Sequence, residues 1–315
     1  MAPSRHQRTA DPKAEQKSPP SLQPNCHFGR TLRAIALYMI ENLKGLAEND
    51  ALDGTQAVHD VRRLMKRWRS LLRLLAPFLE GPSEKLREDA RALARRLSVA
   101  RDAQAAIDAL HDALEAPKAR AASISPRTLE TLRTRLQGRR SSQETVGWSK
   151  AVRRDLSNYA TAAAYQVAHW PLDAVGFDDL AERLARTYRR ARRAIPEDWD
   201  SVHAEELHAL RRRVIEIRYQ LELVEPAWPR FGRMWVEEAQ RLRTRLGSYQ
   251  DLEMLRALTA PRQPLAPWRS RLLPIVAARQ AEHAKAAARI AARLFAEPPK
   301  AFQRRIEAIW EGQEK

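Results

Sequence analysis

From Phe28 onward, the sequence has continuous support for helices and none for strands. Ala, Leu, Arg and Glu dominate this region, and all four are strong helix formers. The alternating apolar patterns and β-branched runs that predict strands are absent, and glycine is rare, with 10 in 315 residues. Hydrophobic residues make up 44 % of the chain, which is enough for a large core. The sequence therefore predicts an all-α fold.

Proline and glycine mark the ends of the expected helices. These helices are expected at residues 28–48, 55–79, 82–100, 102–116, 126–137, 143–168, 177–195, 201–225, 229–247, 249–259, 265–296 and 298–312. Pro274 is expected to kink or restart the helix around it. Residues 1–26 are rich in Pro, Ser, Lys and Gln, so they are predicted to form a disordered basic tail. The folded domain is then expected over residues 27–315.

Two segments of the chain, Val58–Leu79 and Leu207–Trp228, repeat one another without a gap at a constant spacing (208 − 59 = 149). The matched positions are His59 with His208, Arg62 with Arg211, Arg63 with Arg212, Arg69 with Arg218, Leu72 with Leu221, Leu74 with Leu223 and Pro77 with Pro226. Beyond the two segments, Leu97 matches Leu246 and Asp102 matches Asp251 at the same spacing. The repeat predicts two pseudo-symmetric helical bundles that arose by internal duplication, with units near residues 28–140 and 176–315. Asp102 and Asp251 are expected where helices begin, either as N-caps or in salt bridges that orient the basic residues.

The first copy of the repeat places a row of basic side chains along one helix. At about 100° per residue, five groups fall within an arc of roughly 80°. These groups are His59, Arg62, Lys66, Arg69 and Arg73. A solvated basic face would alternate with acidic residues, because like charges four residues apart repel one another. Only Asp60 is acidic between His59 and Arg73, so the pattern favours a surface that binds a phosphate-rich polyanion.

The second copy keeps part of this row. His208, Arg211 and Arg218 reproduce the arc, whereas Ile215 and Glu222 stand where the first copy has Lys66 and Arg73. The second copy is therefore predicted to be the weaker cationic surface. Neighbouring basic residues that could complete the lining are Arg63, Arg212, Arg30, Arg33 and Arg190.

The pattern His-x-x-Arg-x-x-x-Lys-x-x-Arg, with a second copy that ends in Arg218-Tyr219, resembles the CHAD domain (conserved histidine α-helical domain) family. The segments Leu97–Asp102 and Leu246–Asp251 also resemble its Leu-Gly motifs. The resemblance implies two helical bundles about an approximate two-fold axis, with a basic central groove or pore that binds inorganic polyphosphate. The row and the resemblance together predict these polyphosphate-binding residues: His59, Arg62, Arg63, Lys66, Arg69, Arg73, His208, Arg211, Arg212, Arg218, Tyr219, Arg30, Arg33 and Arg190.

Composition and motifs narrow the function further. The chain has 56 Lys and Arg against 39 Asp and Glu, a formal charge of +17, which indicates an anionic partner. There is no phosphate-binding loop and no nucleophile elbow, and His203 and His208 lie five residues apart, so they diverge on a helix. The single cysteine excludes an internal disulfide. We therefore expect a non-catalytic module without a metal or a cofactor.

Several alternatives stay open at this point. A nucleic-acid-binding protein would carry the same excess of positive charge, so nucleic acid is an expected competitor for the site. An accessory subunit of an enzyme that metabolises polyphosphate or triphosphate is a second alternative, and a scaffold for an acidic protein is a third. No run of 18 apolar residues predicts a membrane span, so we expect no membrane partner and a cytoplasmic location, with polyphosphate granules as one site. The sequence does not give the oligomeric state.

Overall fold

The computed structural model describes residues 19–23, 26–79, 81–97, 101–115 and 125–314. The predicted tail, 1–26, lies mostly outside these residues. Within it, Leu22 is fully buried against the large core, so the packed part of the chain begins before Cys26. None of the described helices is both long enough and apolar enough to cross a membrane.

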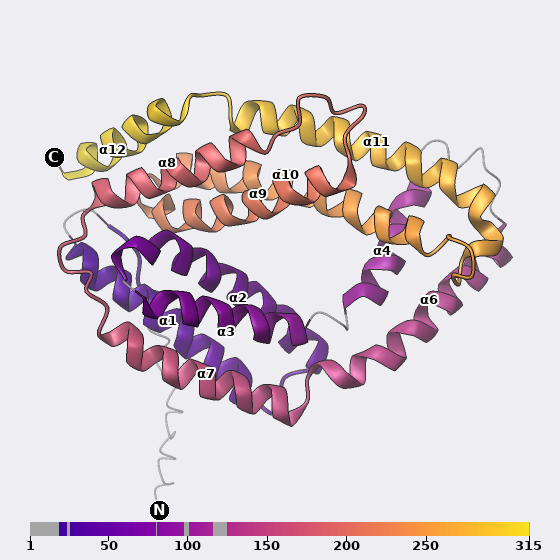
Figure 1. Cartoon of the computed structure of the whole chain (residues 1–315), viewed down its shortest axis with the longest axis horizontal. Helices are drawn as coiled ribbons and strands as arrows, with labels where there is room; N and C mark the ends of the chain where they lie inside the picture. Colours follow the sequence, from indigo (N-terminus) through magenta and orange to yellow (C-terminus); the bar gives the residue numbers. More distant parts are fainter. Residues whose placement is uncertain (1–18, 24–25, 80, 98–100, 116–124, 315) are drawn as a thin grey trace, which may run out of the picture.

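The described residues form helices and no strands, which confirms the predicted fold class (Figure 1). The α-helices are α1 (Phe28–Glu48), α2 (Gly54–Leu75), α3 (Pro82–Arg96), α4 (Arg101–Glu115), α6 (Pro126–Gly147), α7 (Lys150–Ala168), α8 (Phe177–Arg193), α9 (Ala204–Val224), α10 (Pro229–Ala257), α11 (Arg269–Leu294) and α12 (Pro299–Glu314). Short 3-10 turns are η1 (Ala76–Phe78), η2 (Glu225–Ala227) and η3 (Ala266–Trp268).

Two predicted breaks are absent from the structure. Helix α6 continues through the expected connection at 138–142, and α10 continues through residue 248, between the two helices expected at 229–247 and 249–259. Gly247 is buried, and a Cβ at this position would lie 3.1 Å from Nη2 of Arg211. This glycine therefore allows close packing of α9 on α10 rather than ending a helix. Because α10 is continuous, Asp251 lies inside it and cannot be an N-cap, so this alternative is wrong and the salt-bridge alternative stays a prediction.

The helices pack around two hydrophobic cores. The larger core contains side chains from α1, α2, α3, α7, α8, α9 and α12, together with parts of α10 and α11. The smaller core joins α4 and α6 to the C-terminal part of α10 and the N-terminal part of α11. The long helices α10 and α11 therefore connect the two bundles, as Figure 1 shows.

Helices α2 and α9, which carry the two copies of the repeat, pack directly against each other. The Ser70 hydroxyl donates to the carbonyl oxygen of Glu216 at 2.9 Å. Arg67 lies 3.9 Å from a carboxylate oxygen of Glu222, and Arg73 lies 3.8 Å from one of Glu216. Since the lower-numbered arginine meets the higher-numbered glutamate, the two helices run antiparallel.

The bounds of several elements recur at the spacing of the sequence repeat. Helices α1 and α8 begin at Phe28 and Phe177, which are 149 residues apart. Turns η1 and η2 begin at Ala76 and Glu225, and the spacing is the same. Helices α7 and α12 begin at Lys150 and Pro299, again at this spacing. The duplication stays a prediction, and at this spacing α7 corresponds to α12.

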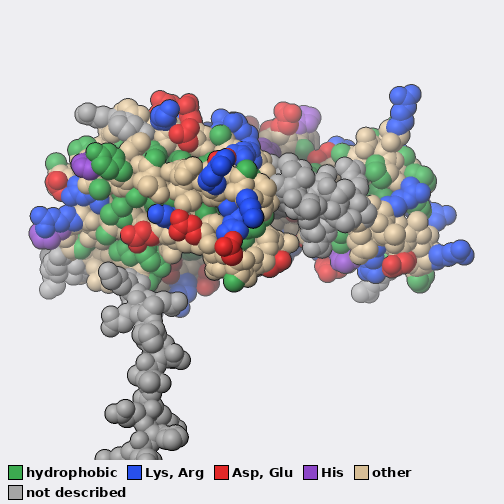
Figure 2. Space-filling model, turned by 90° about the horizontal axis from the view of Figure 1, so that it is seen from below, with side chains coloured by type: hydrophobic (Ala, Val, Ile, Leu, Met, Phe, Trp, Pro, Cys, Tyr) green, Lys and Arg blue, Asp and Glu red, His purple; other side chains and the backbone are tan. Residues whose placement is uncertain are grey.

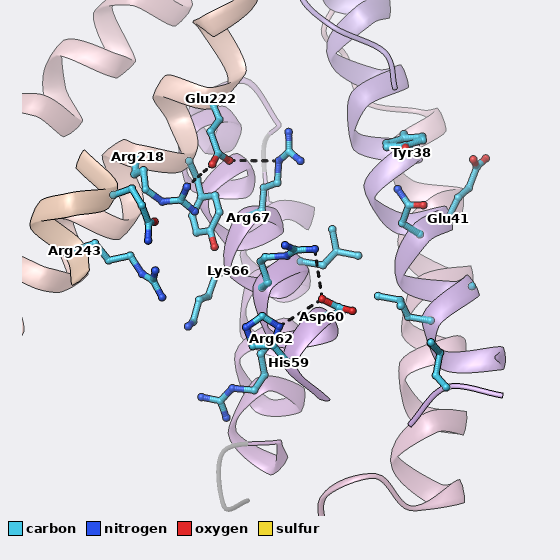
Figure 3. Close-up of a pocket in the computed structure, with 18 of the residues that line it drawn as sticks. Tyr38, Glu41, His59, Asp60, Arg62, Lys66, Arg67, Arg218, Glu222 and Arg243 are labelled. Atoms are coloured by element: carbon cyan, nitrogen blue, oxygen red, sulfur yellow. Dashed lines mark hydrogen bonds and ion pairs between the residues drawn. The ribbon is translucent and has the colours of Figure 1, made fainter. Parts of the chain in front are cut away.

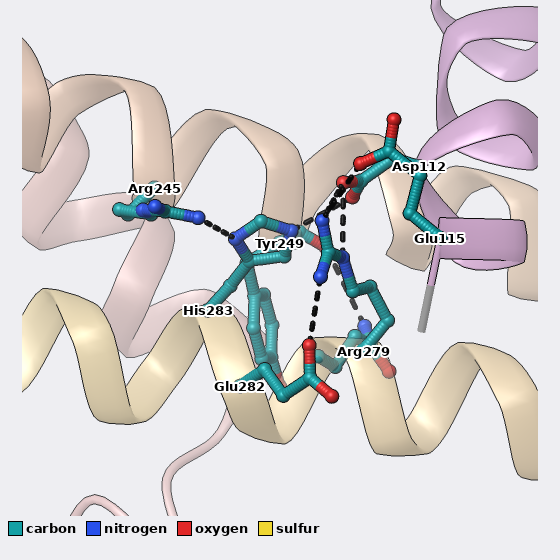
Figure 4. Close-up of polar contacts among 8 residues, drawn as sticks. Asp112, Glu115, Arg245, Tyr249, Arg279, Glu282 and His283 are labelled. Carbon is teal, nitrogen blue, oxygen red and sulfur yellow. Dashed lines mark hydrogen bonds and ion pairs between the residues drawn. The ribbon is translucent and has the colours of Figure 1, made fainter. Parts of the chain in front are cut away.

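A buried polar network holds α4 against α10 and α11 in the smaller bundle (Figure 4). His283 is 2 % exposed, and its Nε2 lies 2.7 Å from Oδ2 of Asp112. Nη1 of Arg245 lies 3.4 Å from Nδ1 of the same imidazole. Arg279 donates to Oδ1 of Asp112 from Nε at 3.0 Å and from Nη2 at 2.8 Å. Burial raises the pKa of Asp112, but the hydrogen bonds from His283 and Arg279 outweigh it, so the net pKa is lowered.

We expect Asp112→Asn to lower the free energy of unfolding by about 2 kcal/mol near neutral pH, because it removes a charged hydrogen-bond acceptor from the buried His283 and the partly buried Arg279. A carboxylate with a lowered pKa stabilises the folded state above its ordinary pKa, and this contribution is lost as the pH falls through the folded-state pKa. The difference between variant and wild type should therefore shrink toward pH 3. Urea denaturation from pH 7 to pH 3 measures it, and a difference that does not change with pH would contradict this account.

Candidate anion-binding site

A pocket of about 1390 Å³ lies among α1, α2, α9 and α10, with side chains of the repeated helices along its wall (Figure 3). Its cationic or titratable nitrogen groups are His59, Arg62, Arg63, Lys66, Arg67, Arg218 and Arg243. Its acidic groups are Glu41, Asp60, Glu222 and Glu225. In Figure 3, Lys66 and Arg243 extend from α2 and α10 into the same space. This α2–α9 pocket brings together cationic groups that are far apart in the sequence.

The sequence of α2 explains how it presents its basic side chains. Asp53 caps the helix by accepting hydrogen bonds from the amides of Thr55 at 3.0 Å and Gln56 at 3.1 Å. Val61, Met65 and other apolar side chains on one face are fully buried in the larger core. The opposite face, with His59 and its neighbours, is left to line the pocket.

The pocket is not uniformly basic, because its acidic side chains pair with its cations. Glu222 lies 3.9 Å from Arg67 and also accepts from Arg218. Asp60 lies 3.4 Å from Arg63 and 3.5 Å from Nδ1 of His59. These pairs hold the cationic side chains in place and also reduce the net positive charge that a ligand would meet.

The Asp60 carboxylate is stabilised in its charged form by its surroundings. A hydrogen bond from Gln56 has the largest effect on the pKa of Asp60 and lowers it, and His59 and Arg63 lower it further.

The ring of Tyr219 packs against Arg218, because the guanidinium carbon of Arg218 lies 4.1 Å from the centre of this ring. Tyr219 is only 8 % exposed, so it mainly positions the arginine.

Six of the fourteen predicted binding residues line this pocket: His59, Arg62, Arg63, Lys66, Arg218 and Tyr219. The other eight do not: Arg69, Arg73, His208, Arg211, Arg212, Arg30, Arg33 and Arg190. Arg33 instead donates to the carbonyl oxygen of Trp170 at 2.7 Å and pairs with Asp173. Arg67 and Arg243 line the pocket but were not predicted. Arg67 lies beside the row on α2, and no sequence signal places Arg243 next to it.

Two of the predicted arginines are held by the segments that carry the Leu-Gly motifs. Arg62 donates to the carbonyl oxygen of Leu97 at 2.6 Å, and Arg211 donates to the side chain of Gln250. The Gln250 amide also contacts Nδ1 of His208. In each half of the chain, the repeated helix is therefore tied to the motif that follows it.

A second group of basic side chains gathers where α2 and α9 meet α3 and α8. This arginine cluster consists of Arg69, Arg73, Arg87, Arg91, Arg95, Arg190 and Arg213. Three of these arginines surround Glu216, which is 2 % exposed and lies 3.8 Å from Arg73, 3.2 Å from Arg190 and 3.4 Å from Arg213. The pKa of Arg73 is lowered chiefly by burial, and Glu216 opposes this effect.

Arg69 lies among the arginines of the cluster. Burial lowers its pKa first, and the charges of Arg73, Arg91, Arg87 and Arg95 lower it further. Its Nε atom is buried and has no hydrogen-bond partner. On the face of the molecule in Figure 2, Lys and Arg side chains are interspersed with Asp and Glu. Arg69 is thus in an unusually cationic environment that an anion would relieve.

The model of the CHAD domain family matches residues 37–260, which is more than half of the chain. The chain belongs to the CHAD domain family. The match includes α2 and α9 with the pocket and the arginine cluster between them, and it ends before α11 and α12. No curated protein matches the sequence. Among the residues that the structure describes, no group of three or more His, Cys, Asp or Glu side chains could hold a metal ion.

Proposed function

We propose that this CHAD-domain protein binds inorganic polyphosphate and does not catalyse a reaction on it. The observation that carries the proposal is the convergence of His59, Arg62 and Lys66 from α2 with Arg218 from α9 in one pocket. The sequence repeat relates Arg218 to Arg69, and family resemblance assigns such residues to polyphosphate binding.

Polyphosphate is a chemically suitable ligand for this surface. The linear polymer carries about one negative charge per phosphate and has no bases, so charge and spacing must provide its recognition. Arginine presents a planar fork that pairs with two phosphate oxygens at once. Pocket arginines already held by carboxylates, such as Arg67 and Arg218 beside Glu222, would lose little side-chain entropy on binding.

Duplex DNA is the main alternative ligand, because it also offers a row of phosphates. We expect the protein to bind long-chain polyphosphate at least about tenfold more tightly than duplex DNA at matched phosphate concentration, since a pocket that encloses a thin polymer excludes a duplex. Fluorescence competition against a labelled polyphosphate measures this preference, with pyrophosphate as a short-chain control.

Each outcome of this competition decides between the candidate functions. Equal or tighter binding of DNA would overturn the assignment of polyphosphate as the ligand. A separate assay of phosphate release from polyphosphate in the presence of magnesium tests the non-catalytic part of the proposal, and release would overturn it and favour a role in polyphosphate metabolism. Binding to polyphosphate also implies a place at polyphosphate granules in the cytoplasm, which a fluorescent fusion would reveal.

A further inference from the structure

The α2–α9 pocket and the arginine cluster occupy corresponding places in the two copies of the repeat. The pocket is completed by α1 and α10, and the cluster by α3 and α8. At the repeat spacing of 149 residues, α1 corresponds to α8, and α3 corresponds to the first part of α10. The two surfaces can therefore be compared position by position.

The comparison shows a difference in charge. Glu41 of the pocket corresponds to Arg190 of the cluster, and Glu222 corresponds to Arg73. At one position the difference in charge is reversed, because Arg67 of the pocket corresponds to Glu216 of the cluster. In sum, six Lys and Arg side chains of the pocket face four carboxylates, whereas in the cluster Glu216 contacts Arg73, Arg190 and Arg213.

The charge around Arg69 is less balanced than the charge in the pocket. Glu216 contacts Arg73, Arg190 and Arg213, and Arg87 pairs separately with Glu84 at 3.1 Å. The charges that lower the pKa of Arg69 all belong to arginines, and its buried Nε has no partner. Confining like charges in a partly desolvated place costs free energy, which a bound anion recovers.

We infer that the arginine cluster, rather than the α2–α9 pocket, is the tighter site for the phosphate polymer; this inference rests on the proposed function. The guanidinium groups of Arg69 and Arg73 would pair with phosphate oxygens in the interior of the surface, and Arg91 with those at its edge. The pocket then contributes a second, weaker contact along the same polymer. The second copy of the repeat has Ile215 and Glu222 in place of Lys66 and Arg73. The basic side chains beside this copy therefore come from α2, α3 and α8.

The test compares three variants that each remove two positive charges. Arg69→Gln/Arg91→Gln alters the cluster, Arg63→Gln/Lys66→Gln alters the pocket, and Arg271→Gln/Arg289→Gln alters exposed positions of α11 outside both surfaces. Affinity for long-chain polyphosphate is measured by fluorescence anisotropy at one salt concentration. We expect a loss of at least about tenfold for the cluster variant and of less than about threefold for the pocket variant, with the α11 variant close to wild type.

A thermal unfolding curve of each variant shows whether it is folded. Should Arg69→Gln/Arg91→Gln be unfolded, the single substitution Arg91→Gln at an exposed position replaces it, and it is compared with Arg63→Gln. Greater loss in the pocket variant than in the cluster variant would overturn the inference while leaving the proposed function intact. Absence of polyphosphate binding by the wild type would overturn both.

Discussion

Replacement of Trp68 by alanine should lower the free energy of unfolding by about 3–5 kcal/mol, the range for deleting a large buried aromatic side chain. Trp68 is 1 % exposed and lies on α2, on the face opposite the basic row. Its ring stacks on Trp170, with centroids 5.9 Å apart and planes 6° apart. Its Nε1–H donates to the hydroxyl of Tyr159 on α7 at 2.6 Å. The truncation would remove packing and a buried hydrogen bond together.

The variant Tyr159→Phe separates these two contributions. The Tyr159 hydroxyl accepts from Trp68 and donates to the carbonyl oxygen of Leu86 at 2.9 Å. Burial has the largest effect on the pKa of this hydroxyl and raises it, so the group stays protonated and can donate. Its removal keeps the ring but leaves a buried donor and a buried acceptor unpaired, so we expect a loss of about 1–3 kcal/mol.

Chemical denaturation followed by circular dichroism at 222 nm measures both variants. Trp228→Ala is the matched control, because Trp228 is 47 % exposed and its truncation should cost clearly less than that of Trp68. Equal losses for Trp68→Ala and Trp228→Ala would show that the large core does not depend on Trp68. The comparison matters for function because the next residue along α2 is Arg69, whose position in the arginine cluster depends on the packing of this helix.

The features that could be predicted are those that one helix encodes by itself. The bounds of α1, 28–48, agree with the structure, because Pro and Gly positions and capping residues act within a few residues of each other. The basic face of α2 followed from the period of the helix alone. The all-α class followed from composition in the same way, since no segment carries the period of a strand.

Contacts between distant helices could not be predicted from these local signals. Arg67 lies off the predicted row and still lines the pocket, because α9 packs beside α2 and brings Glu222 to it. Glu41 comes to the same pocket from α1. The sequence predicts separate helices at 229–247 and 249–259, whereas α10 is continuous and the missing side chain of Gly247 makes room for Arg211. Each of these depends on a tertiary contact that has no sequence period.

Contacts between distant helices also change which cationic surface is expected to be the weaker one. From the sequence, Ile215 and Glu222 predict a weaker second copy. In the structure, Glu222 belongs to the pocket that the first copy also lines, and it neutralises Arg67 and Arg218 there. Arg73 belongs instead to the cluster that the second copy shares, with Arg190 and Arg213. Because α2 and α9 pack antiparallel, side chains from both copies of the repeat line the pocket and the cluster. Neither copy forms either surface alone.

Polyphosphate affinity should fall about 10³-fold between 50 mM and 200 mM salt. Each phosphate contact by Lys or Arg releases condensed counterions, and for duplex nucleic acids the slope of log affinity against log salt is about −0.9 per contact. Six ionic contacts, the number of Lys and Arg side chains in the pocket, would give a slope near −5. The seven arginines of the cluster can make it steeper.

The slope of log affinity against log salt reports how many cationic side chains contact the polymer, independently of the absolute affinity. Removing two contacting charges should make it shallower by about 2, and removing two remote charges on α11 should leave it unchanged. A series of titrations from 50 mM to 400 mM salt measures the slopes of the wild type and of both kinds of variant. A wild-type slope near −2 would mean that only two or so cations contact the polymer, and the acidic residues of the pocket would then dominate over its basic ones. A steep slope that depends on the pocket and cluster arginines would instead show that these surfaces act together along one chain of phosphates.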